Sequence, residues 1–201
     1  MAPRSTPKRA TSKREAPVKS FATADAMAEW LDKNHSSHTG IWLRIAKKNS
    51  GGKSVNYLEA VELALIHGWI DGQRKTDTEK TFIQKFTPRT ARSMWSRINR
   101  EKVGALIAGG RMKPRGLAEV ERAKKDGRWE SAYDSPKNAK VPPDLAKALK
   151  ANRAAAAFFK TLSSSNRYAI LWRLQTAKRP ETRARRLEDF VKRLEKGETF
   201  H

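Results

Sequence analysis

The segment from Phe86 to Lys102 holds the densest group of side chains that could bind an anion. Basic residues alternate there with hydroxyl, amide and indole groups, close to an expected helix start. Guanidinium groups donate in pairs to carboxylate or phosphate, and the N–H groups of a helix start also favour anions. The candidate ligand-binding residues of this segment are Arg89, Arg92, Trp95, Ser96, Arg97, Asn99 and Arg100. The competing interpretation is structural, with Trp95 in the core, Ser93 as a helix cap and the arginines on a solvated face.

A second polar group precedes that segment. Trp69, Asp71 and Gln73 fall in a short expected strand, and polar groups at the ends of strands and helices tend to form sites. With Arg89, Ser96 and Asn99 they would form a polar pocket, which keeps an enzyme as an alternative function. The simpler interpretation is that Asp71 pairs with an arginine. No catalytic residue is identified, and we expect a protein without enzymatic activity.

A third cationic group lies near the C-terminus, at Arg183, Arg185 and Arg186. Together with the basic N-terminal tail it could hold phosphates, so non-specific nucleic-acid binding is a second alternative. No recognised nucleic-acid motif supports sequence-specific binding. Helices of this pattern more often pack their apolar stripe inward while the charges face solvent.

Other chemistries are weakly supported or excluded. The chain has no Cys, which excludes disulfides, thiolate catalysis and cysteine-ligated metals. His35 and His38 lie three residues apart in a Ser-rich loop that offers few carboxylate partners, so we expect no metal site and no cofactor. A pair between His67 and Asp71 is conceivable, but a histidine at a helix end more often interacts with the helix dipole.

Positive charge is concentrated in particular segments. The 201 residues include 43 Lys and Arg against 21 Asp and Glu, a formal net charge of +22. Residues 1–20 carry +5, residues 85–128 carry +9 and residues 144–201 carry +8, whereas residues 21–84 and 129–143 are neutral. A localised positive field attracts polyanions, so the expected partner is anionic: nucleic acid, an acidic protein or an anionic lipid surface. The alternative is that the charge only keeps the protein soluble.

No stretch of about 18 apolar residues is present, so we expect no transmembrane segment. The first 20 residues lack the apolar centre of a secretory signal. The absence of Cys also fits a reducing compartment, and we expect a cytoplasmic protein. The oligomeric state has no signature in the sequence.

Apolar spacing predicts an α+β fold in the N-terminal body, with a small β-sheet packed with helices. The expected helices are a first one from a Thr23 cap to Asn34, then Tyr57–His67, Ser93–Ala108 and Leu117–Asp126. Asn56 and Glu59 have capping-box spacing, and Gly68 can end the second helix. The expected strands are Ile41–Lys47, Trp69–Arg74 and Thr81–Thr87.

The remaining chain predicts an all-α helical bundle. Apolar residues recur at helical spacing through residues 145–194, and three prolines between Asp134 and Pro143 mark a connecting segment. We therefore predict a disordered basic tail (1–20), an α+β domain (21–135), a linker (136–143) and a helical bundle (144–201).

With these segments in view, the sequence resembles the bacterial YdeI/OmpD-associated family, also called bacteriocin-protection proteins. The resemblance rests on Gly40–Lys48, on Gly68-Trp69-Ile70-Asp71-Gly72-Gln73, on Phe86-Thr87-Pro88-Arg89 with Trp95-Ser96 and Asn99, on Gly116–Val120 and on Asn166–Leu171. The tail before Phe21 falls outside it. The resemblance implies a bacterial cytoplasmic protein of α+β and helical build with a role in bacteriocin, antimicrobial-peptide or envelope-stress tolerance, and it supplies no active site.

These observations favour a non-enzymatic binding protein of this family that acts through an anionic partner docked near Arg89, Arg92, Trp95, Arg97 and Arg100. Because a basic protein repels cationic peptides, any protection against them would be indirect.

Overall fold

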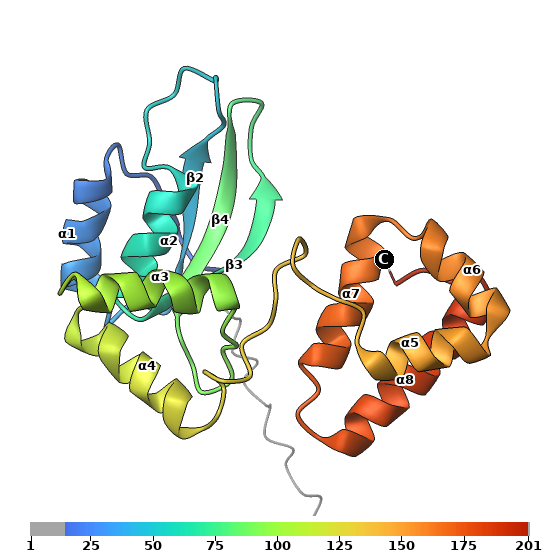
Figure 1. Ribbon diagram of the computed structural model, residues 1–201. Coiled ribbons are helices and arrows are strands. Elements are labelled where there is room, and N and C mark those ends of the chain that lie inside the picture. The colour runs from blue at the N-terminus through green and yellow to red at the C-terminus, as the bar shows by residue number, and fades with distance from the viewer. Residues whose placement is uncertain (1–14, 201) are drawn as a thin grey trace, which may run out of the picture. The chain divides into compact units, whose positions relative to one another are not determined.

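The computed structural model describes residues 15–200, which form parts of two compact units, Met1–Arg89 and Thr90–His201. The α+β fold class and the helical C-terminal region are both confirmed (Figure 1). Most of the predicted basic tail, residues 1–14, lies outside the described residues. The predicted domain boundaries at 21–135, 136–143 and 144–201 remain predictions.

The first unit is built on a four-stranded sheet in the order β1-β2-β4-β3. Its strands are β1 (Val18–Lys19), β2 (Ile41–Ala46), β3 (Trp69–Thr76) and β4 (Thr81–Pro88). β2, β3 and β4 confirm the three predicted strands and pair antiparallel. β1 pairs parallel with β2. The sequence did not predict this strand, because two residues are too few to show alternation.

Alternation along β2 places Ile41, Leu43 and Ile45 on one buried face of the sheet, and Trp42 on the opposite face is also buried. Ile41, Leu43 and Ile45 are at most 2% exposed and lie opposite Phe86, Gln84 and Phe82 of β4. Gly40, just before β2, has φ of 140°, and a Cβ there would lie 2.9 Å from the carbonyl oxygen of Phe86. Only glycine fits this junction between the loop and the sheet.

Two helices complete the first unit, α1 (Ala24–Asn34) and α2 (Tyr57–Ile66). Both begin as predicted, because Thr23 caps α1 and the reciprocal Asn56–Glu59 capping box starts α2. Gly68 follows α2 with φ of 73°, the left-handed conformation expected of a glycine after a helix. The two helices lie next to one another in Figure 1.

The second unit begins with α3 (Arg97–Ala108) and α4 (Pro114–Lys125). The predicted start of α3 at Ser93 is wrong, because Ser96 is the residue whose hydroxyl accepts the N–H of Asn99. α4 begins before the predicted Leu117, because Pro114 occupies its first position, where a proline loses no helical hydrogen bond.

Four further helices form the predicted bundle: α5 (Pro143–Ala151), α6 (Arg153–Thr161), α7 (Ser164–Gln175) and α8 (Pro180–Glu195). They gather around one apolar core (Figure 1). Leu145, Ile170, Leu174 and Leu194 are fully buried there. The residues between α4 and α5, where the sequence predicts the linker, contribute to the candidate site.

Candidate functional site

A cavity of about 410 Å³ opens in the second unit beside the segment that joins α4 to α5. We call it the linker cavity. Its volume falls in the range of small-molecule sites. It combines cationic, amide and apolar groups: Arg97, Asp134, Asn138, Ala139, Lys140, Pro142, Leu171, Gln175 and Arg183. Arg97 comes from the first predicted anion-binding segment and Arg183 from the predicted nucleic-acid group, so the fold brings two separately predicted residues to one cavity.

Asp134 is the carboxylate of this lining, and several partners hold it. Oδ1 lies 3.1 Å from Nε of Arg97, and Oδ2 accepts Nε2 of Gln175 at 3.0 Å. The backbone N–H of Asp134 donates to Oε1 of Gln175 at 3.1 Å, and its carbonyl accepts the Tyr168 hydroxyl at 2.8 Å. Asp134 thereby ties the start of α3 to two turns of α7.

Arg183 lines the cavity with a positive charge that hydrogen bonds hold in place. Its Nε and Nη2 donate to the two oxygens of Asp144 at 2.7 and 2.9 Å, and Nη1 donates to the carbonyl of Leu174 at 2.6 Å. This bidentate pair holds the pKa of the Asp144 carboxyl below its usual value. The arginine therefore joins α8 to both α5 and α7 while facing the cavity.

Arg97 and Lys140 keep donors that no group among residues 15–200 accepts. The Arg97 side chain is 61% exposed and approaches Asp134 through Nε, while its two terminal nitrogens have no partner within residues 15–200. Lys140 is exposed and makes no hydrogen bond or ion pair within the same residues. The amide side chain of Asn138 is likewise exposed. These groups are oriented donors of the kind that carboxylates and phosphates accept.

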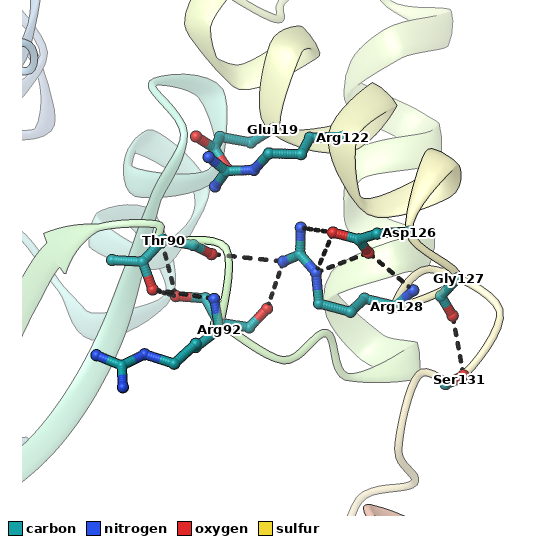
Figure 2. Close-up of polar contacts among 9 residues, drawn as sticks. Thr90, Arg92, Glu119, Arg122, Asp126, Gly127, Arg128 and Ser131 are labelled. Carbon is teal, nitrogen blue, oxygen red and sulfur yellow. Dashed lines mark hydrogen bonds and ion pairs between the residues drawn. The ribbon is translucent and has the colours of Figure 1, made fainter. Parts of the chain in front are cut away.

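The loop that carries Arg92 is held by a buried arginine, Arg128, which is 1% exposed. Figure 2 shows its guanidinium between Asp126 and the loop: Nε lies 2.8 Å from both oxygens of Asp126, and Nη1 donates to the carbonyl of Ser93 at 2.7 Å. Within the loop, the Thr90 hydroxyl accepts the N–H of Arg92. Sequence reasoning did not single out Arg128, because nothing in its neighbourhood distinguishes a structural arginine from a solvated one.

The other predicted residues near α3 have structural contacts. Trp95 is 1% exposed and its ring packs edge-on against Trp129 at 5.0 Å. Arg100 lies over the Trp129 ring, donates to the Trp129 carbonyl at 2.6 Å and approaches Glu130. Ser96 and Asn99 form the helix cap, whereas Arg92 is exposed. Of the predicted residues in this unit, Arg97 and Arg183 line the linker cavity.

The predicted residues of the first unit are spread along β3 and β4. Trp69 is fully buried and donates from Nε1 to the carbonyl of His35. Asp71 accepts a hydrogen bond from the Tyr57 hydroxyl at 2.8 Å. Its partner is therefore a tyrosine, whereas the sequence suggested an arginine. Gln73 is exposed, and Arg89 is 3% exposed. These four residues lie in a different unit from Ser96 and Asn99, and the pocket predicted from all six remains a prediction.

The three arginines predicted to bind nucleic acid, Arg183, Arg185 and Arg186, lie in different environments. Arg183 pairs with Asp144, and Arg186 donates to the carbonyl of Arg173 at 2.6 Å. Arg185 is exposed on α8. Two of the three guanidinium groups therefore hold α8 against neighbouring elements, and phosphate binding by the group remains a prediction.

His67 is paired differently from the sequence hypothesis. Its ring is buried, Nδ1 lies 2.8 Å from the carbonyl of Leu63, and Nε2 lies 3.0 Å from Asp32. The partner is thus Asp32 of α1 and not Asp71. Within residues 15–200, no group of three His, Asp or Glu side chains is arranged to hold a metal ion, and no helix is long and apolar enough to cross a bilayer.

Family comparisons divide the chain differently from the sequence resemblance. Residues 19–119, just over half of the chain, match the model of a domain of unknown function, DUF8412. Residues 138–197 match the model described as bacteriocin-protection, YdeI or OmpD-associated. The glycine and tryptophan motifs at Gly68–Gln73 therefore fall in the first match, and Asn166–Leu171 falls in the second. No curated protein and no solved structure matches the chain significantly.

Most residues that line the linker cavity lie in the second matched region, residues 138–197. Asn138, Lys140, Leu171, Gln175 and Arg183 lie within residues 138–197, whereas Arg97 lies in the first match. The chain belongs to the DUF8412 family over residues 19–119, and its residues 138–197 resemble the YdeI/OmpD-associated, bacteriocin-protection family.

Proposed function

We propose that this protein binds an anionic partner without transforming it, and that the linker cavity is the binding site. The observation that carries the proposal is the lining itself. Arg97, Lys140 and Arg183 bring three cationic groups to one cavity, against the single carboxylate of Asp134. Even when Asp144, the partner of Arg183, is counted, the site keeps an excess of positive charge.

Two further features support binding. The terminal nitrogens of Arg97 and the ammonium of Lys140 are available donors, so a ligand gains hydrogen bonds without breaking those of the protein. The basic segments on either side, residues 85–128 with +9 and residues 144–201 with +8, add a field that attracts anions toward this unit.

The family of the C-terminal domain supplies the biological part of the proposal, namely a role in tolerance of bacteriocins, antimicrobial peptides or envelope stress. Because the cavity is cationic, it would bind an anionic component and not the cationic peptide itself. Tolerance would then depend on the partner. Nucleic acid, acidic protein, anionic lipid and small organic anions are the partner classes to be distinguished.

The test is binding across ionic strength with a matched pair of charge-reversal variants. One variant is Arg97→Glu with Lys140→Glu. The control is Lys150→Glu with Arg153→Glu, two exposed cations of the same unit that do not line the cavity. Both variants change the net charge equally, so they affect long-range attraction similarly. We expect the cavity variant to lose about tenfold or more in affinity and the control to stay within about threefold.

Single-stranded DNA, anionic vesicles, an acidic peptide and phenyl phosphate are the partners to titrate. Stronger binding to one class, lost in the cavity variant, identifies that class. Binding that falls equally in both variants would show a general charge effect and would contradict the cavity as the site. The same variants, expressed in a bacterium exposed to a bacteriocin, test whether tolerance follows binding.

A further inference from the structure

We infer that the ligand of the linker cavity is a small organic oxyanion, a carboxylate or phosphate group on a compact apolar body, and not a segment of a polyanion. This inference rests on the proposed function and specifies its ligand. It depends on three properties of the cavity: which donors are available, which walls are apolar, and how large the space is.

The available donors fit one oxyanion group. Arg97 uses Nε toward Asp134 and keeps both terminal nitrogens, which form a planar fork that matches the two oxygens of a carboxylate or phosphate. Lys140 adds a point charge, and Asn138 adds an amide. Arg183 has each of its three nitrogens engaged by Asp144 or Leu174, so it contributes mainly its field.

Asp134 limits the total negative charge that the cavity accepts. Gln175 holds this carboxylate at two points and Tyr168 holds its carbonyl, so Asp134 does not depend on Arg97 alone for its position. A ligand can therefore take the fork of Arg97 while Asp134 stays in place. The repulsion between Asp134 and the ligand favours a single acid group over several neighbouring phosphates.

The remaining walls are apolar. Leu171, Ala139 and Pro142 line the same cavity, and Leu171 is 6% exposed and anchored in the bundle core. An inorganic ion leaves these surfaces in contact with water, whereas an apolar body attached to the acid group covers them. The volume of about 410 Å³ suits a compact organic molecule and is too small for more than one or two units of a polymer.

Calorimetric titration of the full chain with matched probes tests this inference. At pH 8.5 phenyl phosphate and inorganic phosphate are both almost fully dianionic, so the difference between their affinities reports the apolar contribution. Benzoate replaces the phosphate by a carboxylate. We expect phenyl phosphate to bind about tenfold or more tightly than inorganic phosphate. Lys140→Ala, which removes an exposed side chain that has no partner in the described part of the chain, should weaken phenyl phosphate binding about fivefold, and Lys150→Ala should not.

Arg97→Lys distinguishes the effect of the paired guanidinium donors from the effect of the positive charge, because it keeps the charge and loses the paired donors. It should also weaken binding, and Asp134→Asn should strengthen it. If inorganic phosphate binds as tightly as phenyl phosphate, or if neither binds while a 20-nucleotide DNA strand binds with sensitivity to Lys140→Ala, the small-ligand inference is overturned and the proposed function stands. If no anion binds, both are overturned.

Discussion

Gln175 holds Asp134 through a pair of hydrogen bonds, accepting its backbone N–H at 3.1 Å and donating to its carboxylate at 3.0 Å. A primary amide side chain is one of the few groups that can satisfy a neighbouring donor and acceptor together. The pair fixes the segment before α5 onto the last turn of α7. It also sets the distance between Asp134 and the cations of the linker cavity.

Gln175→Leu should destabilise the protein by about 1–3 kcal/mol, because the amide N–H and one carboxylate oxygen of Asp134 lose their partner. Urea unfolding followed by tryptophan fluorescence measures the change. Gln73→Leu, at an exposed position of β3, is the matched control and should alter stability by less than about 0.5 kcal/mol. Equal effects at both positions would show that the pair contributes nothing particular.

Tyr168 links stability to alkaline pH. Burial, with smaller contributions from Tyr133 and Asp134, raises the pKa of its hydroxyl to about 12. In the unfolded chain this group ionises near its usual value of about 10. The protonated hydroxyl therefore stabilises the fold below about pH 10, and this contribution is lost as the pH rises from about 10 to about 12.

Tyr168→Phe should remove that pH dependence and cost about 1 kcal/mol near neutral pH, where the bond to the carbonyl of Asp134 is lost. Unfolding free energies at pH 7, 9, 10 and 11 measure both effects. Parallel pH profiles for the variant and the wild type would contradict the role of this hydroxyl.

Asp144 links stability to acid pH. Its bidentate bond with Arg183 lowers the pKa of the carboxyl, so the carboxylate stabilises the fold above the usual Asp value of about 4. This stability is lost as the pH falls below about 4, through the lowered folded-state value. Asp144→Asn should be about 1 kcal/mol less stable at pH 7 and should lose less stability than the wild type on acidification. Acid titration of the fold by circular dichroism compares the two.

Arg128 should be among the most sensitive charged residues of the second unit. Arg128→Met leaves the carbonyl of Ser93 without its buried donor, whereas the Asp126 carboxylate stays partly solvated, and the substitution should cost about 1–3 kcal/mol. Lys124→Met, which removes an exposed cation paired with Glu121, should cost less than about 1 kcal/mol. Thermal unfolding of the two variants provides the comparison, and a small loss for Arg128→Met would mean that the loop holds itself.

Local sequence patterns predicted most of the elements. The capping box at Asn56 and Glu59, the alternation along Ile41–Ala46 and the apolar spacing of α8 depend on neighbouring residues and are visible in the sequence. β1 was missed because its pairing with β2 is not local. The start of α3 was misplaced because Ser93 and Ser96 are both suitable caps, and the non-local β-bridge between Ser96 and Tyr133 keeps the backbone extended up to Ser96.

The site was predicted in fragments. Arg97 and Arg183 were each recognised as cations able to bind anions, but they were assigned to different sites, because no pattern reports contact between distant segments. Lys140 fell in the predicted linker, residues 136–143, and Asp134 fell at the end of the predicted α+β domain, so neither was considered for a site. The three prolines of the linker were read as a spacer, although a rigid segment with polar side chains can equally well form the wall of a cavity.

The central claim is that anions bind in the linker cavity and not over the basic surface at large. Two-dimensional ¹⁵N NMR of the full chain, titrated with phenyl phosphate at moderate salt, tests it directly. Binding in the cavity predicts saturable shifts concentrated at the amides of Arg97, Asn138, Lys140 and Leu171, with half-saturation at an about fivefold higher ligand concentration in Lys140→Ala. Small unsaturable shifts scattered over exposed lysines and arginines, such as Lys150 and Arg153, would contradict it.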